Sequence, residues 1–128
     1  MQTFKKSERL CSKKIIELLF RKGHSFFMHP YKVIWIETAL PSEYPAQVLL
    51  TATKKHHKKA VTRNLIKRRL REIYRKQKES LYQQLQTQKK QIALAIICVA
   101  NENPEYSEAE KKIILILQRL IKQLNEHS

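Results

Sequence analysis

Residues 54–78 hold twelve lysines and arginines and a single glutamate, and this basic segment constrains the protein more than any other feature. No glycine or proline interrupts residues 59–85, and apolar side chains recur there with helical spacing. The apolar stripe consists of Ile66, Leu70, Ile73 and Tyr74. The pattern predicts one helix over Lys59–Leu85 that buries this stripe and leaves its basic side chains elsewhere on its surface.

A second stripe on the same helix carries side chains that suit RNA. At about 100° per residue it lies roughly 120° from the apolar stripe. Its members are Asn64, Arg68, Arg71, Arg75 and Lys78, with Lys67 at the edge. Guanidinium groups match phosphate oxygens in pairs, and an asparagine amide can bond a phosphate, a 2′-hydroxyl or a base edge. The lysines of residues 54–59 extend the positive surface into the preceding loop.

The net charge of +15 indicates a polyanionic partner, because so basic a surface repels itself in isolation. A purely solvated face needs no such density of charge. A membrane-surface helix would need its apolar stripe free, whereas here that stripe is expected to cover a sheet. No apolar run approaches the ~20 residues that span a bilayer, and the N-terminus lacks the apolar stretch of a signal peptide. Cys11 and Cys98 stand alone, as reduced thiols of a cytoplasmic protein do.

The N-terminal half predicts a helix followed by strands. Ser12 is suited to cap a helix that ends at Gly23, the only glycine. Residues 31–38 and 46–53 are rich in β-branched and apolar side chains, with two prolines between them, and predict an antiparallel hairpin. A small additional strand is expected near Phe26–Met28.

The C-terminal half predicts a strand and a helix. Residues 91–100 form a continuous apolar run, which is typical of a buried central strand. Ser107 and Glu110 have the spacing of a capping box that opens a last helix. The order α-β-β-(β)-α-β-α predicts an α+β fold, with residues 1–128 as a single two-layer domain whose helices pack on a small, mostly antiparallel sheet.

No catalytic centre of the protein's own is expected. The five histidines have no matched carboxylate or cysteine partners. His56 and His57 could hold a metal in principle, but the neighbouring lysines oppose a divalent cation. We therefore predict neither catalytic nor metal-ligating residues in this chain, which argues against a self-sufficient nuclease.

The basic segment resembles the signature of the bacterial ribonuclease P protein family. That signature follows a strand ending in Lys-Lys and runs as Arg-Asn-Arg, then Ile-Lys-Arg, then another arginine three residues later. Lys54-Lys55, Arg63-Asn64, Ile66-Lys67-Arg68 and Arg71 match it. Arg9-Leu10, Phe20 and Gly23 also stand at family positions, and the resemblance covers nearly the whole chain.

The resemblance implies a protein subunit of ribonuclease P that supports 5′ maturation of tRNA while the RNA subunit performs the hydrolysis. The implied partners are the ribonuclease P RNA and precursor tRNA, and the implied cofactor is Mg²⁺ held mainly by the RNA subunit and substrate. The expected RNA-binding residues are Lys54, Lys55, Lys58, Lys59, Arg63, Asn64, Lys67, Arg68, Arg71 and Arg75. A cleft for the single-stranded 5′ leader is expected beside Ile16, Phe20, Ile34 and Thr51.

Three positions depart from the family pattern. Leu65 replaces the second arginine of Arg-Asn-Arg, so one backbone contact is lost or moves to a neighbour such as Arg69. Leu49 replaces a glycine of the second strand, which narrows the approach to the sheet, and Ile16 replaces an aromatic residue of the cleft. Phe20, Tyr31 and Trp35 are candidates for stacking on bases, although for each of them a place in the core is the better fit. The alternative function is an RNA-binding module without enzymatic partners, such as a ribosomal protein.

Overall fold

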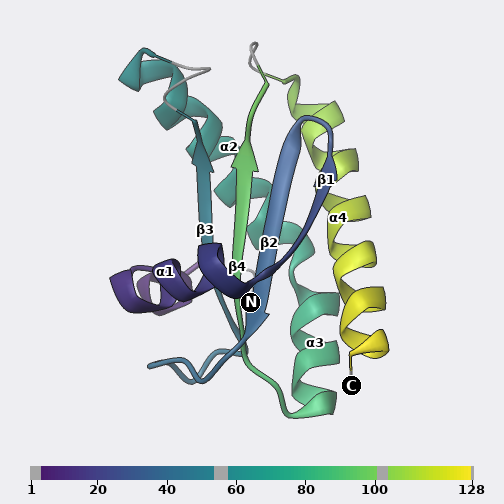
Figure 1. Cartoon of the computed structure of the whole chain (residues 1–128). Helices are drawn as coiled ribbons and strands as arrows, with labels where there is room; N and C mark the ends of the chain where they lie inside the picture. Colours follow the sequence, from purple (N-terminus) through teal and green to yellow (C-terminus); the bar gives the residue numbers. More distant parts are fainter. Residues whose placement is uncertain (1–3, 54–57, 101–103, 128) are drawn as a thin grey trace.

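A computed structural model of the protein describes residues 4–53, 58–100 and 104–127. Four strands of this part form one sheet in the order β1-β2-β4-β3 (Figure 1). The elements are a short 3-10 helix Lys6–Glu8, α1 Lys13–Lys22, β1 His24–Met28, β2 Tyr31–Glu37, β3 Ala46–Ala52, α2 Ala60–Gln77, α3 Glu79–Gln88, β4 Ile92–Cys98 and α4 Tyr106–Glu126. The α+β fold and the mostly antiparallel sheet are confirmed, since only β3 and β4 pair in parallel.

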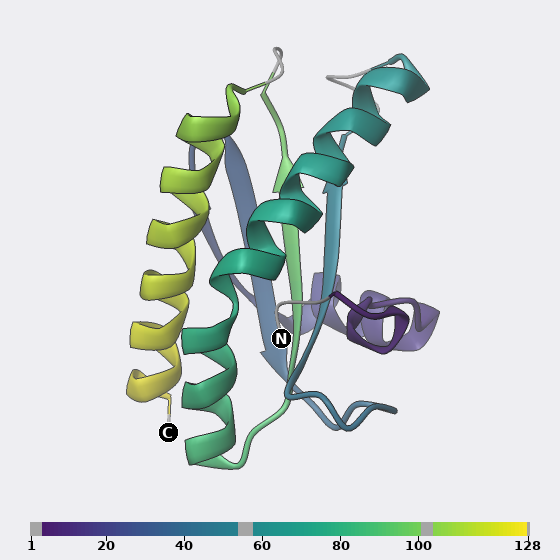
Figure 2. The ribbon, with the colours of Figure 1, turned by 180° about the vertical axis from the view of Figure 1, so that it is seen from behind.

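Helices cover both faces of the sheet. The helices α2, α3 and α4 lie on one face of the sheet (Figure 2). On this face Ile66, Leu70, Ile73 and Tyr74 of α2 enter the larger core cluster, as predicted. The helix α1 lies on the other face, over a smaller cluster that contains Leu19. It adds a layer that the expected two-layer arrangement lacks. All seven residues of β4 are buried, which confirms the predicted central strand.

The predicted hairpin of residues 31–38 and 46–53 is wrong. The strand β4 lies between β2 and β3, pairing antiparallel with the first and parallel with the second. The apolar β4 suits a central place, because there strands pair with both of its edges and helices cover both of its faces. Gln91 fixes the connection from β2 to β3, because its amide donates to the carbonyls of Ser42 and Tyr44 at 2.9 and 3.0 Å.

The predicted helix Lys59–Leu85 is divided at Lys78 into α2 and α3. The cause is tertiary, because no glycine or proline is present. The side chain of Lys78 turns inward to a buried carboxylate, that of Glu8. The change of direction brings α3 alongside α4, where Gln84 and Gln88 donate to Asn125.

The helix ends also test the predicted caps. Ser12 caps α1 as expected, accepting from the backbone of Ile15 at 3.3 Å. The predicted capping box at Ser107 is wrong, because α4 begins at Tyr106 with Glu105 as N-cap. An earlier start places the Tyr106 ring against the core and 5.8 Å from the ammonium of Lys76.

Gly23 ends α1 in extended backbone, with φ of −70°, so it does not serve as a left-handed cap. The glycine is required by space. A Cβ atom there would lie 2.7 Å from Cγ2 of Ile34 and would collide with the carbonyl oxygen of Leu19. The turn from α1 into β1 therefore packs directly on β2.

Candidate nucleic-acid interface

The basic stripe of α2 gathers around one surface hollow of about 520 Å³. The hollow is lined by Val61, Asn64, Leu65, Lys67, Arg68 and Arg71. The apolar core stripe holds α2 against the sheet and so fixes which side faces outward. Four predicted RNA-binding residues therefore lie together, with the apolar side chains of Leu65 and the largely exposed Val61 between them.

Other predicted RNA-binding residues extend this surface. Lys58 and Lys59 are exposed at the start of α2, whose first turn carries no acidic residue. Arg63 donates to the carbonyl of Lys58 at 2.9 Å and so fixes the turn before the helix. The positive end of the helix dipole adds to these charges and favours an anion. Lys54 and Lys55 lie outside the described residues.

Toward the C-terminal end of α2, a carboxylate neutralises part of the positive charge of the stripe. The guanidinium of Arg75 lies 2.6 Å from the Glu72 carboxylate, and the ammonium of Lys76 lies 3.7 Å from it. The hydrogen bond from Arg75 lowers the pKa of Glu72. Lys78 belongs to the predicted stripe by spacing but is buried, and its charge is taken up by Glu8. The exposed positive surface therefore lies toward the N-terminal half of α2.

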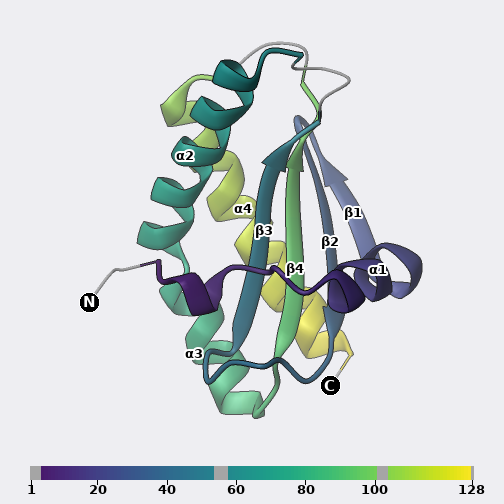
Figure 3. The same ribbon diagram turned by 90° about the vertical axis from the view of Figure 1, so that its left-hand side faces the viewer.

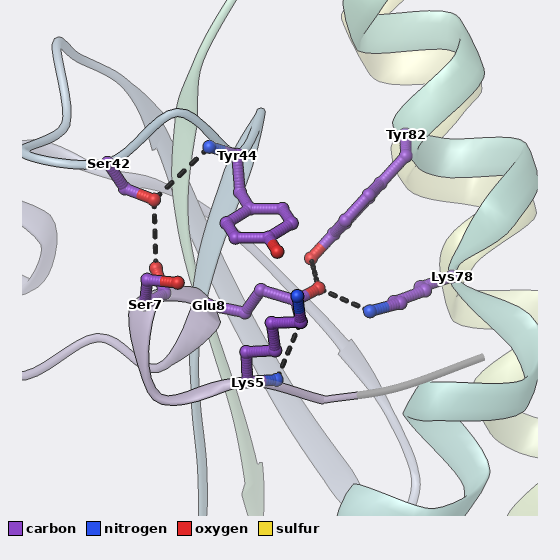
Figure 4. Close-up of polar contacts among 7 residues, drawn as sticks. All are labelled: Lys5, Ser7, Glu8, Ser42, Tyr44, Lys78 and Tyr82. Carbon is purple, nitrogen blue, oxygen red and sulfur yellow. Dashed lines mark hydrogen bonds and ion pairs between the residues drawn. The ribbon is translucent and has the colours of Figure 1, made fainter. Parts of the chain in front are cut away.

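A buried polar cluster anchors the N-terminal segment to the junction of α2 and α3 (Figure 4). The Glu8 carboxylate is fully buried and accepts from the Lys78 ammonium, from the Tyr82 hydroxyl at 2.6 Å and from the backbone of Lys5 at 2.7 Å. Burial alone would raise the pKa of Glu8, but these donors and the charge of Lys78 lower it overall. Desolvation raises the pKa of Tyr82, so both groups keep the protonation states that this cluster needs.

The residues predicted for a leader cleft share the α1 face of the sheet but differ in access. Phe20 is 50% exposed on α1, whereas Ile34 is 4% exposed in the smaller core cluster. Ile16 packs partly against that cluster, and Thr51 on β3 is half-buried. Phe20 is thus the residue of this set best placed to meet a base, while Ile34 supports α1 from below.

Tyr31 and Trp35 belong to the larger core on the opposite face, each 1% exposed. The Trp35 indole donates to Gln123 of α4 at 2.8 Å. Neither ring can stack on RNA there, which agrees with the core position preferred from the sequence.

Two kinds of feature are absent from the described part of the chain, a cluster of metal ligands and a membrane span. No three histidine, cysteine, aspartate or glutamate side chains gather there in a way that could hold a metal ion. His56 and His57 lie outside the described residues. Within residues 4–53, 58–100 and 104–127, no helix is long and apolar enough to cross a membrane.

Comparison with known proteins gives one family throughout. The family model described as Ribonuclease P matches residues 4–121. A ribonuclease P protein component of Porphyromonas gingivalis is 33% identical over 118 residues, covering 90% of this chain and 84% of that protein. Among solved structures, the Staphylococcus aureus RNase P protein has a TM-score of 0.66 at 18% identity, covering 90% of this chain and 96% of the other. The Thermotoga maritima RNase P protein has a TM-score of 0.64 at 21% identity, covering 88% and 96%.

Proposed function

Because this chain belongs to the bacterial ribonuclease P protein family, we propose that the exposed basic face of α2 is the surface through which it binds RNA. The chain is the protein subunit of ribonuclease P, the endoribonuclease that matures the 5′ end of tRNA, and its partner in that enzyme is the ribonuclease P RNA. We propose in addition that the protein contacts precursor tRNA.

The hollow on α2 is the observation that carries the proposal. It is lined by Asn64, Lys67, Arg68 and Arg71, and each of these four side chains carries hydrogen-bond donors for phosphate oxygens. Charged hydrogen bonds to phosphate position an RNA helix without reading its sequence. Leu65, in place of the expected arginine, adds an apolar side chain to the lining of this hollow. The neighbouring Arg69 does not take over the RNA contact of that arginine, because its guanidinium donates to the carbonyl of Pro104 at 3.2 Å.

We propose that Mg²⁺ acts on the RNA side of the complex. The α2 stripe presents mainly ammonium and guanidinium groups, which do not fit a divalent cation. RNA phosphates do fit it, and Mg²⁺ bound to them supplies an activated water for hydrolysis. The protein's cations lower the repulsion between the RNA subunit and precursor tRNA, so that the complex needs less Mg²⁺ to form. We infer a cytoplasmic location, since precursor tRNA is made there.

Reconstitution at low Mg²⁺ tests this function. The protein is mixed with a cognate ribonuclease P RNA and a precursor tRNA, and release of the 5′ leader is measured. We expect cleavage that requires both subunits and a loss of RNA affinity of about 1–3 kcal/mol for Arg68→Ala. Lys111→Ala is the matched control, because Lys111 is an exposed cation on α4, away from the hollow.

Three outcomes would contradict the proposal. Cleavage by the protein without RNA would point to a self-sufficient nuclease. RNA binding that is equally weakened by Arg68→Ala and Lys111→Ala would mean that only net charge matters. Tight binding to the RNA without stimulation of cleavage would favour the ribosomal-type RNA-binding module.

A further inference from the structure

The N-terminal segment, residues 4–11, pairs with β3 and forms one wall of a surface hollow. Arg9 makes a parallel bridge to Val48, and the backbone of Leu10 donates to the carbonyl of Val48 at 3.0 Å. The carbonyl of Ser7 accepts from Ser42 at 2.9 Å and from Gln47 at 3.0 Å. Figure 3 shows the segment crossing the sheet beside β3. With Glu8 turned inward, the next side chain along the segment, Arg9, points to the outside, where it is exposed.

A hollow of about 230 Å³ lies between this wall, β3 and α2. It is lined by Phe4, Arg9, Leu10, Cys11, Val48, Leu49, Leu50 and Arg71. The Arg9 guanidinium lies 5.6 Å from the centre of the Phe4 ring, and that ring meets Tyr74 edge-on at 5.7 Å. Arg9 is therefore held in place by an aromatic contact that itself rests on the core.

Two guanidinium groups from distant parts of the chain line this hollow without a compensating charge. Among its lining residues, all within the described part of the chain, none carries a carboxylate. Neither Arg9 nor Arg71 forms an ion pair with another described residue. The nearest buried acid, Glu8, already serves Lys78. Two unpaired arginines in one concave site favour an anion, and the paired donors of guanidinium match phosphate oxygens.

We propose that Arg9 and Arg71 bind one phosphodiester group of RNA in this hollow, which we call the Arg9–Arg71 pocket. The inference rests on the proposed function and extends it to a residue outside the basic helix. Arg71 also lines the α2 hollow, so the two sites adjoin at this residue. The apolar side chain of Leu49, which is only partly buried, is available to the sugar beside the phosphate. The pocket lies where the RNA surface of α2 meets the sheet.

Binding measurements on point variants give the first test. Arg9→Ala should weaken RNA affinity roughly tenfold or more and reduce the slope of log K against log salt by about 1. Arg9→Lys keeps the charge but loses the paired donors, so it should retain the slope while losing part of the affinity. The melting temperature should stay the same, because Arg9 is exposed. Lys6→Ala is the matched control, since Lys6 is an exposed cation of the same segment that does not line the pocket.

Cys11 gives a second, local readout. It is exposed and lines the pocket, whereas Cys98, the other cysteine of the chain, is buried. Alkylation of Cys11 should slow in proportion to the RNA-bound fraction of the wild-type protein. The RNA subunit alone, and then the holoenzyme with precursor or leaderless tRNA, identify which RNA supplies the phosphate. Inorganic phosphate is the small-anion probe.

The outcomes separate this proposal from the proposed function. An affinity loss for Arg9→Ala no larger than that of Lys6→Ala, with Cys11 equally reactive in free and RNA-bound protein, would overturn the pocket alone. Protection of Cys11 by inorganic phosphate but by none of the RNAs would also overturn RNA as its occupant. A loss for Arg9→Ala with no loss for Arg68→Ala would instead overturn the α2 surface.

Discussion

The Glu8 carboxylate is fully buried yet ionised, and its removal should destabilise the protein strongly. Glu8→Ala leaves the Lys78 ammonium buried without its partner, which costs about 3–5 kcal/mol in comparable cases. Urea unfolding at neutral pH measures the loss. The double variant Glu8→Gln/Lys78→Met should recover much of it, because no unpaired charge then remains. Equal unfolding midpoints for wild type and Glu8→Ala would show that the pair contributes nothing.

The same residue makes the stability depend on pH. The pKa of Glu8 is lower in the folded protein than its ordinary value of 4.5. Its contribution is therefore fully present above that value and is lost as the pH falls through the lower folded pKa. In urea unfolding the difference between wild type and Glu8→Gln should shrink below pH 4.5 and stay constant above it. A difference that instead grew on acidification would mean that the carboxyl is protonated when folded.

Phe20 is the residue at which leader binding can be separated from binding to the RNA subunit. It is half exposed, so Phe20→Ala should cost less stability than the roughly 3–5 kcal/mol of a core phenylalanine. Loss of one stacked base should weaken holoenzyme binding to precursor tRNA by about 1–3 kcal/mol and leave mature tRNA unaffected. Phe27→Ala is the matched control, being 54% exposed on β1. An equal loss for both tRNAs, together with a large fall in melting temperature, would refute this role.

At the scale of elements, local patterns predicted which segments form helices and strands, and tertiary contacts decided how they join. The apolar run of β4 and the core stripe of α2 were recognisable because burial imposes its own periodicity. The place of β4 between β2 and β3 was not recognisable from the sequence. Strand order depends on contacts between distant segments, which no local pattern records. The break at Lys78 likewise depends on Glu8, seventy positions earlier in the chain. No local signal marks such a pairing.

The residues of the candidate site also fall into those that local patterns predict and those that only the tertiary structure brings together. Asn64, Lys67, Arg68 and Arg71 were predictable because they share one helix face, and helical geometry keeps them together. The sequence gives no sign that Arg9 meets Arg71, because their meeting requires the N-terminal segment to pair with β3. Ile34 and Thr51 alternate correctly onto the α1 face, but α1 itself buries Ile34. Periodicity gives the face of a strand and not what covers it.

At the scale of the whole molecule, the positive charge is concentrated in the segment of α2 and is separated from the neutral C-terminal segment. The segment 79–128 has equal numbers of acidic and basic residues and supplies β4 and α4 of the core. The segment 54–78 carries a net charge of +11, and its exposed part lies on one side of α2. Like charges so close together repel one another in the free protein, and RNA removes that repulsion when it binds.

This separation predicts opposite effects of salt on the free protein and on its RNA complex. Screening weakens the repulsion among the α2 cations, so added salt should raise the melting temperature of the free protein. The complex should weaken, because each phosphate neutralised contributes roughly −0.7 to −0.9 to the slope of log K against log salt. Six or more contacts give a slope beyond about −4. Filter binding and thermal melts across one salt series measure both, and Arg68→Ala should make the slope shallower by about 1. An affinity that stays flat while the melting temperature rises would mean that the cations of α2 do not touch the RNA.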